Sequence, residues 1–203
     1  MTKNKKSLFI VFEGLDGAGT TTQIDLLAGF LRNENDHKVI VTKEPTNNII
    51  GGIIRGCLTG DWKTTPAGLQ LLFAADRAHH LDHEIKPALS KGCIVISDRY
   101  YLSTIAYGAV DLEKSWLYQI NKKFLKPDIT FLIDVTPETA ISRMQKVRYD
   151  LELFEKKETL EKVRKNYLAI AKEEKNLYII NGEEMITRVR DDVNKIIKRY
   201  IKV

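Results

Sequence analysis

Phe9-Ile-Val-Phe-Glu-Gly-Leu-Asp-Gly-Ala-Gly-Thr-Thr-Thr-Gln23 joins an apolar run to a glycine-rich turn, and an amphipathic stretch compatible with a helix follows at 24–31. The order strand, glycine loop, helix is the context of a phosphate-binding loop. Glycines let backbone N–H groups converge on an anion, and the following helix adds unpaired N–H groups and a positive dipole end. We expect the phosphate contacts to come from Gly14, Gly17, Ala18, Gly19, Thr20, Thr21 and Thr22.

One residue of this stretch departs from the phosphate-loop pattern. The pattern G-x-x-x-x-G-K-[ST] has a lysine after its last glycine, and this chain has Thr20 there. Thr21 keeps the hydroxyl that ligates Mg²⁺ in such loops. The alternative is an ordinary glycine-rich turn between a strand and a helix.

Length and composition indicate a single domain spanning 1–203. The chain has 32 Lys and Arg against 27 Asp and Glu, spread along its length, which suits phosphorylated small molecules better than nucleic acid. The two cysteines, Cys57 and Cys93, lack metal-ligand spacing and are typical of reduced, packed thiols. No signal peptide or membrane-length apolar run is present, so we expect a cytoplasmic protein with no membrane partner.

Short apolar runs alternate with helical patterns along the whole chain. The runs are rich in Ile and Val and nearly continuous, which is typical of strands buried on both faces of a parallel sheet. The predicted strands are 8–12, 38–42, 93–97, 129–135 and 177–180. The predicted helices are 21–33, 69–90, 137–144, 160–175 and 187–201. This alternation predicts a three-layer α/β fold with a five-stranded parallel sheet, whose ligands gather at the carboxyl ends of the strands.

Polar clusters follow several of these strands. They are 43–46 after the second strand, 98–107 after the third, and Asp134 at the end of the fourth. Two more are 73–77 within the long helix and a basic stretch at 143–157. Taken singly, each has a structural explanation, since Asp98 could cap a helix, Arg77 could pair with Asp76 or Glu84, and Phe73 could be core.

Taken together, the motifs resemble those of thymidylate kinase. They are Phe12-Glu-Gly-Leu-Asp-Gly-Ala-Gly19, Glu44-Pro-Thr46, Leu72-Phe-Ala-Ala-Asp-Arg77, Asp98-Arg-Tyr100 and Leu132-Ile-Asp-Val-Thr-Pro137. The resemblance covers about residues 8–181. It implies a P-loop NTPase fold and transfer of the γ-phosphoryl of ATP to dTMP with Mg²⁺, giving dTDP and ADP in dTTP biosynthesis. It also implies a homodimer built on packed helices.

The resemblance also implies roles for residues at the reacting phosphates. Arg99 would bridge the acceptor and transferred phosphates, since a guanidinium stays charged and grips phosphate bidentately. Arg55 would hold the dTMP phosphate, and Asp16 would contact the sugar 3′-hydroxyl, or Mg²⁺ through water. Asp98 would help Thr21 to hold the metal, and Glu44 would line the pocket at the reaction centre.

For the base and sugar, the resemblance implies four further contacts. Phe73 would stack on the pyrimidine, and Thr104 would face its N3. Arg77 would donate to the thymine O4 and would meet the N4 amino group of cytosine donor to donor. Tyr107 would pack beneath C2′ and crowd a ribose hydroxyl.

A lid at about 143–157 would supply cations in this type of enzyme. Some members of the family carry an arginine in the phosphate loop, where this chain has Gly17. The candidate cations are Arg143, Lys146 and Arg148, with Arg143 and Arg148 expected to act in catalysis. The lid itself departs from the usual pattern, because Leu153 stands where many relatives repeat an arginine before Phe-Glu.

Two other functions are compatible with the motifs. The first is a deoxynucleoside kinase of the same superfamily, although Arg55 offers a phosphate site that a nucleoside does not need. The second is a nucleotide-binding protein with little or no turnover, which Thr20 and the loss of a lid arginine at Leu153 would favour.

Overall fold

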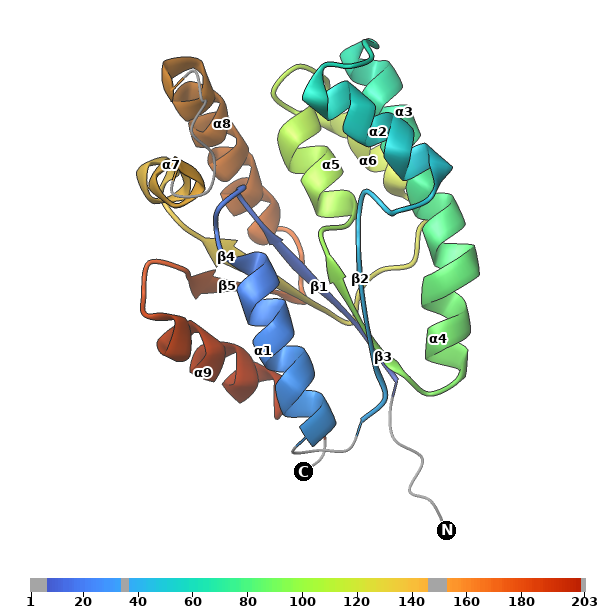
Figure 1. Ribbon diagram of the computed structural model, residues 1–203, viewed down its shortest axis with the longest axis vertical. Coiled ribbons are helices and arrows are strands. Elements are labelled where there is room, and N and C mark those ends of the chain that lie inside the picture. Colours follow the sequence, from blue (N-terminus) through green and yellow to red (C-terminus); the bar gives the residue numbers. More distant parts are fainter. Residues whose placement is uncertain (1–6, 34–36, 146–152, 202–203) are drawn as a thin grey trace.

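A five-stranded parallel sheet forms the centre of the structure (Figure 1). The structure is a computed structural model that describes residues 7–33, 37–145 and 153–201. The strands are β1 Leu8–Gly14, β2 Val39–Lys43, β3 Ile94–Asp98, β4 Ile129–Asp134 and β5 Leu177–Asn181. Their order in the sheet is β2-β3-β1-β4-β5. This confirms the predicted α/β fold and its parallel sheet.

Burial explains why the strand sequences are so apolar. Every residue of β1 is buried, and β3 and β4 are buried except for their final aspartates. The edge strands β2 and β5 are more exposed. Central strands covered on both faces are apolar at most positions, with Glu13, Ser97 and Thr130 as buried polar exceptions, so the alternation of a one-sided sheet is absent from them.

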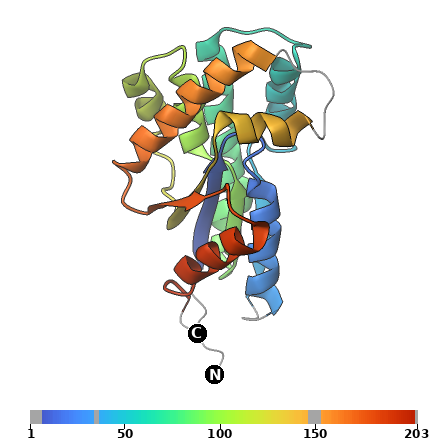
Figure 2. The same cartoon turned by 90° about the vertical axis from the view of Figure 1, so that its left-hand side faces the viewer.

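Helices cover both faces of the sheet (Figures 1 and 2). Helices α1 and α9 pack against each other on one face, and α4, α5 and α8 contact the other. The helices before β4 are α1 Thr20–Asn33, α2 Ile49–Thr59, α3 Pro66–His80, α4 Lys86–Ser90, α5 Tyr101–Gly108 and α6 Lys114–Asn121. The helices after it are α7 Pro137–Gln145, α8 Leu153–Ala171 and α9 Ile186–Ile197. A π-helical turn, Leu81–Ile85, joins α3 to α4.

Three short helices, α2, α5 and α6, lie outside the predicted ranges, and the other helices differ from the prediction mainly at their ends. Helix α3 begins at Pro66 because Thr65 caps it, its hydroxyl accepting a hydrogen bond from the Gly68 N–H at 3.0 Å. Helix α8 begins at Leu153, seven residues before the predicted start at 160. The charged run at its beginning, 155–158, therefore belongs to the helix. Residues 146–152 of the expected lid at about 143–157 lie outside the described residues.

The polar ends of the central strands meet at one edge of the sheet. Asp98 lies in register with Phe12 of β1 on one side and with Lys43 of β2 on the other. Gly14 lies beside Ile133 of β4. The glycine loop, Asp98 and the segment after β2 are therefore neighbours, although Asp98 follows the last glycine of the loop, Gly19, by 79 positions. Among the described helices, none is both long enough and apolar enough to span a membrane.

Candidate active site

The glycine loop is pressed against its surroundings at two positions. Gly17 has φ +83°, and a Cβ there would lie 2.5 Å from the Ala140 carbonyl oxygen of α7. At Gly14 a Cβ would lie 2.8 Å from the Ile133 carbonyl oxygen. Both contacts are with backbone, so a side chain at either position would displace the loop. This close packing is a local reason why position 17 is a glycine and not an arginine.

Thr21 and Asp98 lie together beneath the loop. The Thr21 hydroxyl donates to Asp98 Oδ2 at 2.8 Å, and neither group is buried. Mg²⁺ favours oxygen ligands and keeps several waters and phosphate oxygens, so one hydroxyl and one carboxylate make a sufficient protein share of its shell. The two residues fit the ion.

The described arginine of the predicted lid, Arg143, lies behind the loop. Its guanidinium donates to the Ala18 carbonyl at 3.1 Å and to the Gly182 carbonyl at 2.9 Å. In this arrangement Arg143 braces the loop against the segment after β5. Lys146 and Arg148, the other expected cations, lie outside the described residues.

Arg99 occupies a strained backbone position directly after β3. Its φ is +68°, and the Ser97 hydroxyl donates to its carbonyl oxygen at 2.8 Å. The guanidinium donates to Asp16 Oδ1 at 2.7 Å and to the Ser103 hydroxyl at 3.0 Å. Burial disfavours its charge, but Tyr107 and Asp16 beside it hold the pKa of the Arg99 guanidinium well above its usual range.

A fully buried carboxylate, Glu13, lies under Arg99. It accepts hydrogen bonds from the Tyr100 N–H at 3.1 Å, the Ser103 N–H at 3.3 Å and the Tyr167 hydroxyl at 3.0 Å. Burial raises the pKa of Glu13 to about 7, while hydrogen bonds from Ser103 and Tyr167 and the charge of Arg99 work in the opposite direction. Glu13 thereby caps the first turn of α5, which has no capping side chain of its own.

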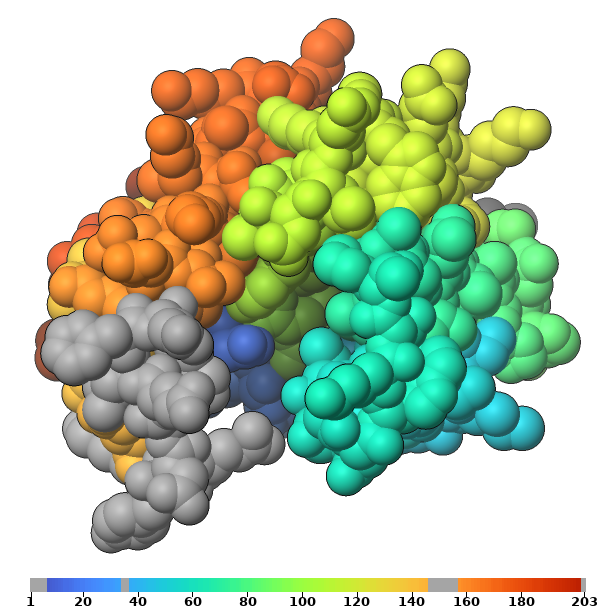
Figure 3. Space-filling model, turned by 90° about the horizontal axis from the view of Figure 1, so that it is seen from above, coloured from blue at the N-terminus to red at the C-terminus, as the bar shows by residue number. Residues whose placement is uncertain are grey.

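Two cavities open at this edge of the sheet. The larger, about 660 Å³, has a volume suited to a nucleotide. Its lining includes Phe73, Arg77, Thr104 and Tyr107. The smaller, about 260 Å³, lies beneath the glycine loop. Asp16, Glu44 and Arg99 line both. Figure 3 looks onto the hollow, between α2–α3 (cyan to teal) and α8 (orange), with blue N-terminal atoms at its floor.

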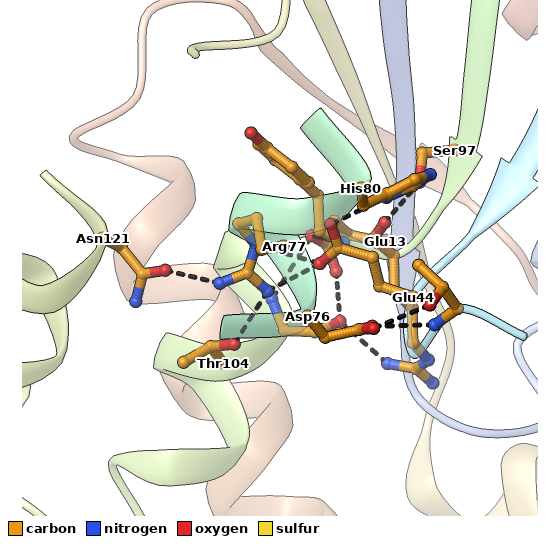
Figure 4. A network of polar contacts seen from close by, with 12 residues as sticks. Glu13, Glu44, Asp76, Arg77, His80, Ser97, Thr104 and Asn121 are labelled. Carbon is orange, nitrogen blue, oxygen red and sulfur yellow. Dashed lines mark hydrogen bonds and ion pairs between the residues drawn. The ribbon is translucent and has the colours of Figure 1, made fainter. Parts of the chain in front are cut away.

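Arg77 stands in the wall of the larger cavity, fixed by a buried polar network (Figure 4). Its Nε donates to Glu44 Oε2 at 2.9 Å and its Nη2 to the Thr104 hydroxyl at 3.0 Å, while Nη1 donates to Asn121 Oδ1. Glu44 also contacts His80 Nδ1 at 3.1 Å. Nη2 also lies 2.7 Å from Glu44 Oε2, so four of the five guanidinium N–H groups face these partners and one, on Nη1, is left for a ligand.

The comparisons with known proteins agree with this geometry. The family model described as thymidylate kinase matches residues 12–193. A probable thymidylate kinase of Thermococcus kodakarensis is 40% identical over 203 residues, covering 96% of this chain and 98% of the relative. A thymidylate kinase of Thermosipho melanesiensis is 38% identical over 195 residues, covering 94% and 97%.

The chain belongs to the thymidylate kinase family. The resemblance of its motifs is thereby confirmed. The individual roles that the resemblance implies for site residues stay predictions, and the structure shows where each residue lies.

Most of the expected thymidylate kinase residues lie together. Asp16, Phe73, Arg77, Arg99, Thr104 and Tyr107 line the larger cavity, and Gly17, Thr20, Thr21 and Asp98 line the smaller one. Tyr107 lies directly beside the loop, since its hydroxyl accepts from the Asp16 N–H at 3.2 Å.

Three polar residues have side-chain partners that the sequence did not predict. Glu44 lines both cavities, but its carboxylate holds Arg77 and His80. Arg77 pairs with Glu44 rather than with Asp76 or Glu84, because Asp76 accepts the N–H and hydroxyl of Thr46. Arg55 donates to the Thr46 carbonyl and does not line either cavity as the described residues form them.

Asp134 has a structural partner. Its two carboxylate oxygens accept from Arg164 of α8 at 2.7 and 2.8 Å. This bidentate pair ties β4 to α8, so the polar residue that ends β4 is engaged with a helix and lies outside the lining of both cavities.

Sequence reasoning missed Glu13, His80 and Asn121. Glu13 carried a signal, because it is a charged residue inside the apolar run that leads into the loop. His80 lies three residues after Arg77 and so on the same face of α3. Asn121 carried none, since only the packing of α6 against α3 brings it to Arg77.

Proposed function

We propose that this protein transfers the γ-phosphoryl group of ATP to dTMP, giving dTDP and ADP. The observation that carries the proposal is the place of Arg99, in the wall shared by a cavity under the phosphate loop and a cavity of nucleotide size. Phosphoryl transfer requires two anions in line with their charge neutralised, and a fixed guanidinium between two such cavities suits that task.

The donor phosphates bind the loop, and dTMP fills the larger cavity. Backbone N–H groups from Gly14 to Thr22 and the N-terminus of α1 hold the donor anion. Phe73 stacks on the base, and Tyr107 packs beneath C2′ of the sugar. One Arg55 N–H donates to the Thr46 carbonyl, and the other N–H groups of its guanidinium would bind the acceptor phosphate.

At the reacting group, Arg99 acts with Asp16. The Asp16 carboxylate at 2.7 Å and the Ser103 hydroxyl at 3.0 Å orient the guanidinium, and the N–H groups that they leave would bridge the two phosphates. Thr21 and Asp98 would hold Mg²⁺, which when bound neutralises phosphate charge. Arg143 supports the loop from behind, and Arg148 supplies further charge from the lid at about 143–157.

The base is selected by Arg77. Its guanidinium is held by Glu44, Asn121 and Thr104, so the Nη1 N–H that remains has a fixed direction. Oxygen O4 of thymine accepts from such a donor, whereas the amino group of cytosine would leave both groups unpaired in a buried site. Thr104 can turn its hydroxyl toward N3 as donor or acceptor, and therefore adds less selectivity.

The protein works as a cytoplasmic homodimer. Helices α2 and α3 pack against each other and expose Ile49, Ile53 and Leu71, with relative exposures of 84%, 41% and 52%. A second copy placed there would cover these side chains. The motifs 72–77 and 98–100 and the family assignment do not favour a deoxynucleoside kinase or a protein without turnover.

An ADP-release assay with four acceptors tests the proposal. We expect turnover with dTMP and dUMP and none above background with dCMP or thymidine. The 5-methyl group contributes about 0.8 kcal/mol, so the preference for dTMP over dUMP should be modest. Efficient use of dCMP would refute the role of Arg77, and efficient use of thymidine would favour the deoxynucleoside kinase.

A further inference from the structure

The phosphate loop of this chain lacks a side-chain cation at position 20, and among the described residues the arginines beside it have other tasks. Arg143 donates to two backbone carbonyls, and Arg99, which is paired with Asp16, lies between the two cavities and is shared with the acceptor. Phosphoryl transfer spreads negative charge over the oxygens of the transferred group, and that charge needs a counter-charge close by.

One more cation lines the cavity beneath the loop. Lys43, the last residue of β2, shares this cavity with Thr20, Thr21 and Asp98. Lys43 and Asp98 are in register on adjacent parallel strands, so the lysine backbone lies one strand away from the proposed metal ligand. Lys43 does not line the larger cavity.

Strand alternation gives the direction of the Lys43 side chain. Thr42 is hydrogen-bonded to His80 and Glu84. Glu44 is hydrogen-bonded to Arg77 and His80. The side chains of Thr42 and Glu44 therefore both point toward α3 and the turn that follows it. Side chains alternate along a strand, and Lys43 between them therefore points to the opposite face. Helix α1 covers that face and contacts β2, with Thr20 and Thr21 at its N-terminus.

The ammonium group of Lys43 is available to a ligand. The residue is exposed, and within the described residues no hydrogen bond or ion pair engages its side chain. Its flexible four-carbon stem suits a lysine that reaches a phosphate as a point charge.

We propose that Lys43 binds the γ-phosphoryl group of ATP from the end of β2, in place of the lysine that the loop lacks at position 20. The inference rests on the proposed function. It assigns Lys43 to the donor and not to dTMP, because Lys43 lines the cavity under the loop and is absent from the lining of the larger one.

Nucleotide affinity tests this contact without turnover. Calorimetric titration of the full chain with ATP and with ADP, both with Mg²⁺, compares the wild type with Lys43→Met. We expect the ATP affinity to fall about tenfold and the ADP affinity by less than about twofold, because only ATP carries the γ group. Lys38→Met is the matched control, an exposed lysine just before the other end of β2, and should change neither.

Single-turnover transfer to dTMP tests whether Lys43 supplies the charge that the loop lacks at position 20. Lys43→Met should lower the rate at least about thirtyfold in the natural background and less than about threefold in Thr20→Lys, which supplies the missing charge. Equal losses in both backgrounds would overturn the proposal. So would unchanged ATP affinity with a raised KM for dTMP, since that places Lys43 on the acceptor. A wild type that transfers nothing to dTMP refutes the proposed function, and the ratio of ATP to ADP affinities still decides on Lys43.

Discussion

Arg99 combines a backbone conformation that few side chains adopt with a guanidinium held by Asp16 and Ser103. Such strain persists only where the surroundings fix it, and here the Arg99 N–H donates to the Phe12 carbonyl at 2.8 Å. The fold thus tolerates a strained backbone at Arg99, which places one positive charge between the two cavities.

Replacing Arg99 with alanine should lower kcat by about three orders of magnitude, because its charge matters most in the transition state. Replacing Arg55 with alanine should chiefly raise KM for dTMP, because a phosphate clamp also acts in the ground state. Steady-state kinetics with dTMP varied separates the two effects. If both variants change only KM, the division of roles is wrong.

Glu13 makes stability depend on pH. Its pKa is raised by burial to about 7 from an ordinary value of 4.5, so the folded state binds this proton more tightly than the unfolded chain. The stabilisation is present below pH 4.5 and is lost as the pH rises toward and through 7. For the wild type relative to Glu13→Gln, the free energy of unfolding should fall by about 3 kcal/mol between pH 4 and pH 8.

Urea unfolding of both proteins across this pH range measures the effect, and the difference between them removes the titrations that they share. A difference that does not vary with pH would show that Glu13 titrates alike in the folded and unfolded chain. Lower stability of Glu13→Gln at every pH would reflect the lost cap of α5 and leaves the pH slope as the readout.

At the scale of elements, the loop between β1 and α1 depends on Gly17. Alanine there meets a positive φ and a Cβ contact of 2.5 Å with the Ala140 carbonyl, so Gly17→Ala should lower the free energy of unfolding by about 2 kcal/mol or more. It should also weaken ATP binding. Gly29→Ala is the control, since Gly29 lies inside α1 with nothing within 4 Å of its Cβ, and should stabilise by up to about 1 kcal/mol. Chemical unfolding and ATP titration of both variants measure these effects. Equal stability of the two would mean that α7 yields to the added methyl group.

The strands could be predicted because each central strand is buried on both faces and leaves a nearly continuous apolar run in the sequence. The gathering of the polar residues at one edge of the sheet could also be predicted, because the strands are parallel and their carboxyl ends meet there. Side-chain pairings could not be predicted in the same way. Arg77 pairs with Glu44 instead of Asp76, because the docking of α3 decides which partner each face of the helix meets. Asn121, 44 residues after Arg77 in the sequence, joins the pair from α6.

At the scale of the whole molecule, the two cavities are separate in shape but share a wall. Asp16 belongs to the loop after β1, Glu44 to the segment after β2, and Arg99 to the segment after β3. These strands are neighbours in the sheet, so a donor and an acceptor bound at this edge are brought together by the sheet itself.

The assembly expected of the whole molecule is a homodimer across α2 and α3. The exposed side chains of Ile53 and Leu71 lie on these two packed helices, and burying them against a second copy would remove apolar surface from water.

Replacing both Ile53 and Leu71 with glutamate would place charges in that interface. We expect the wild type to sediment at twice 23.2 kDa and the double variant at the monomer mass. Met185→Glu, which charges a side chain 74% exposed at the other end of the chain, should leave the dimer intact. Sedimentation equilibrium at several concentrations measures this, together with dTMP turnover of the monomer. The interface lies elsewhere if the double variant remains dimeric, and a wild type that is monomeric at every concentration refutes the dimer.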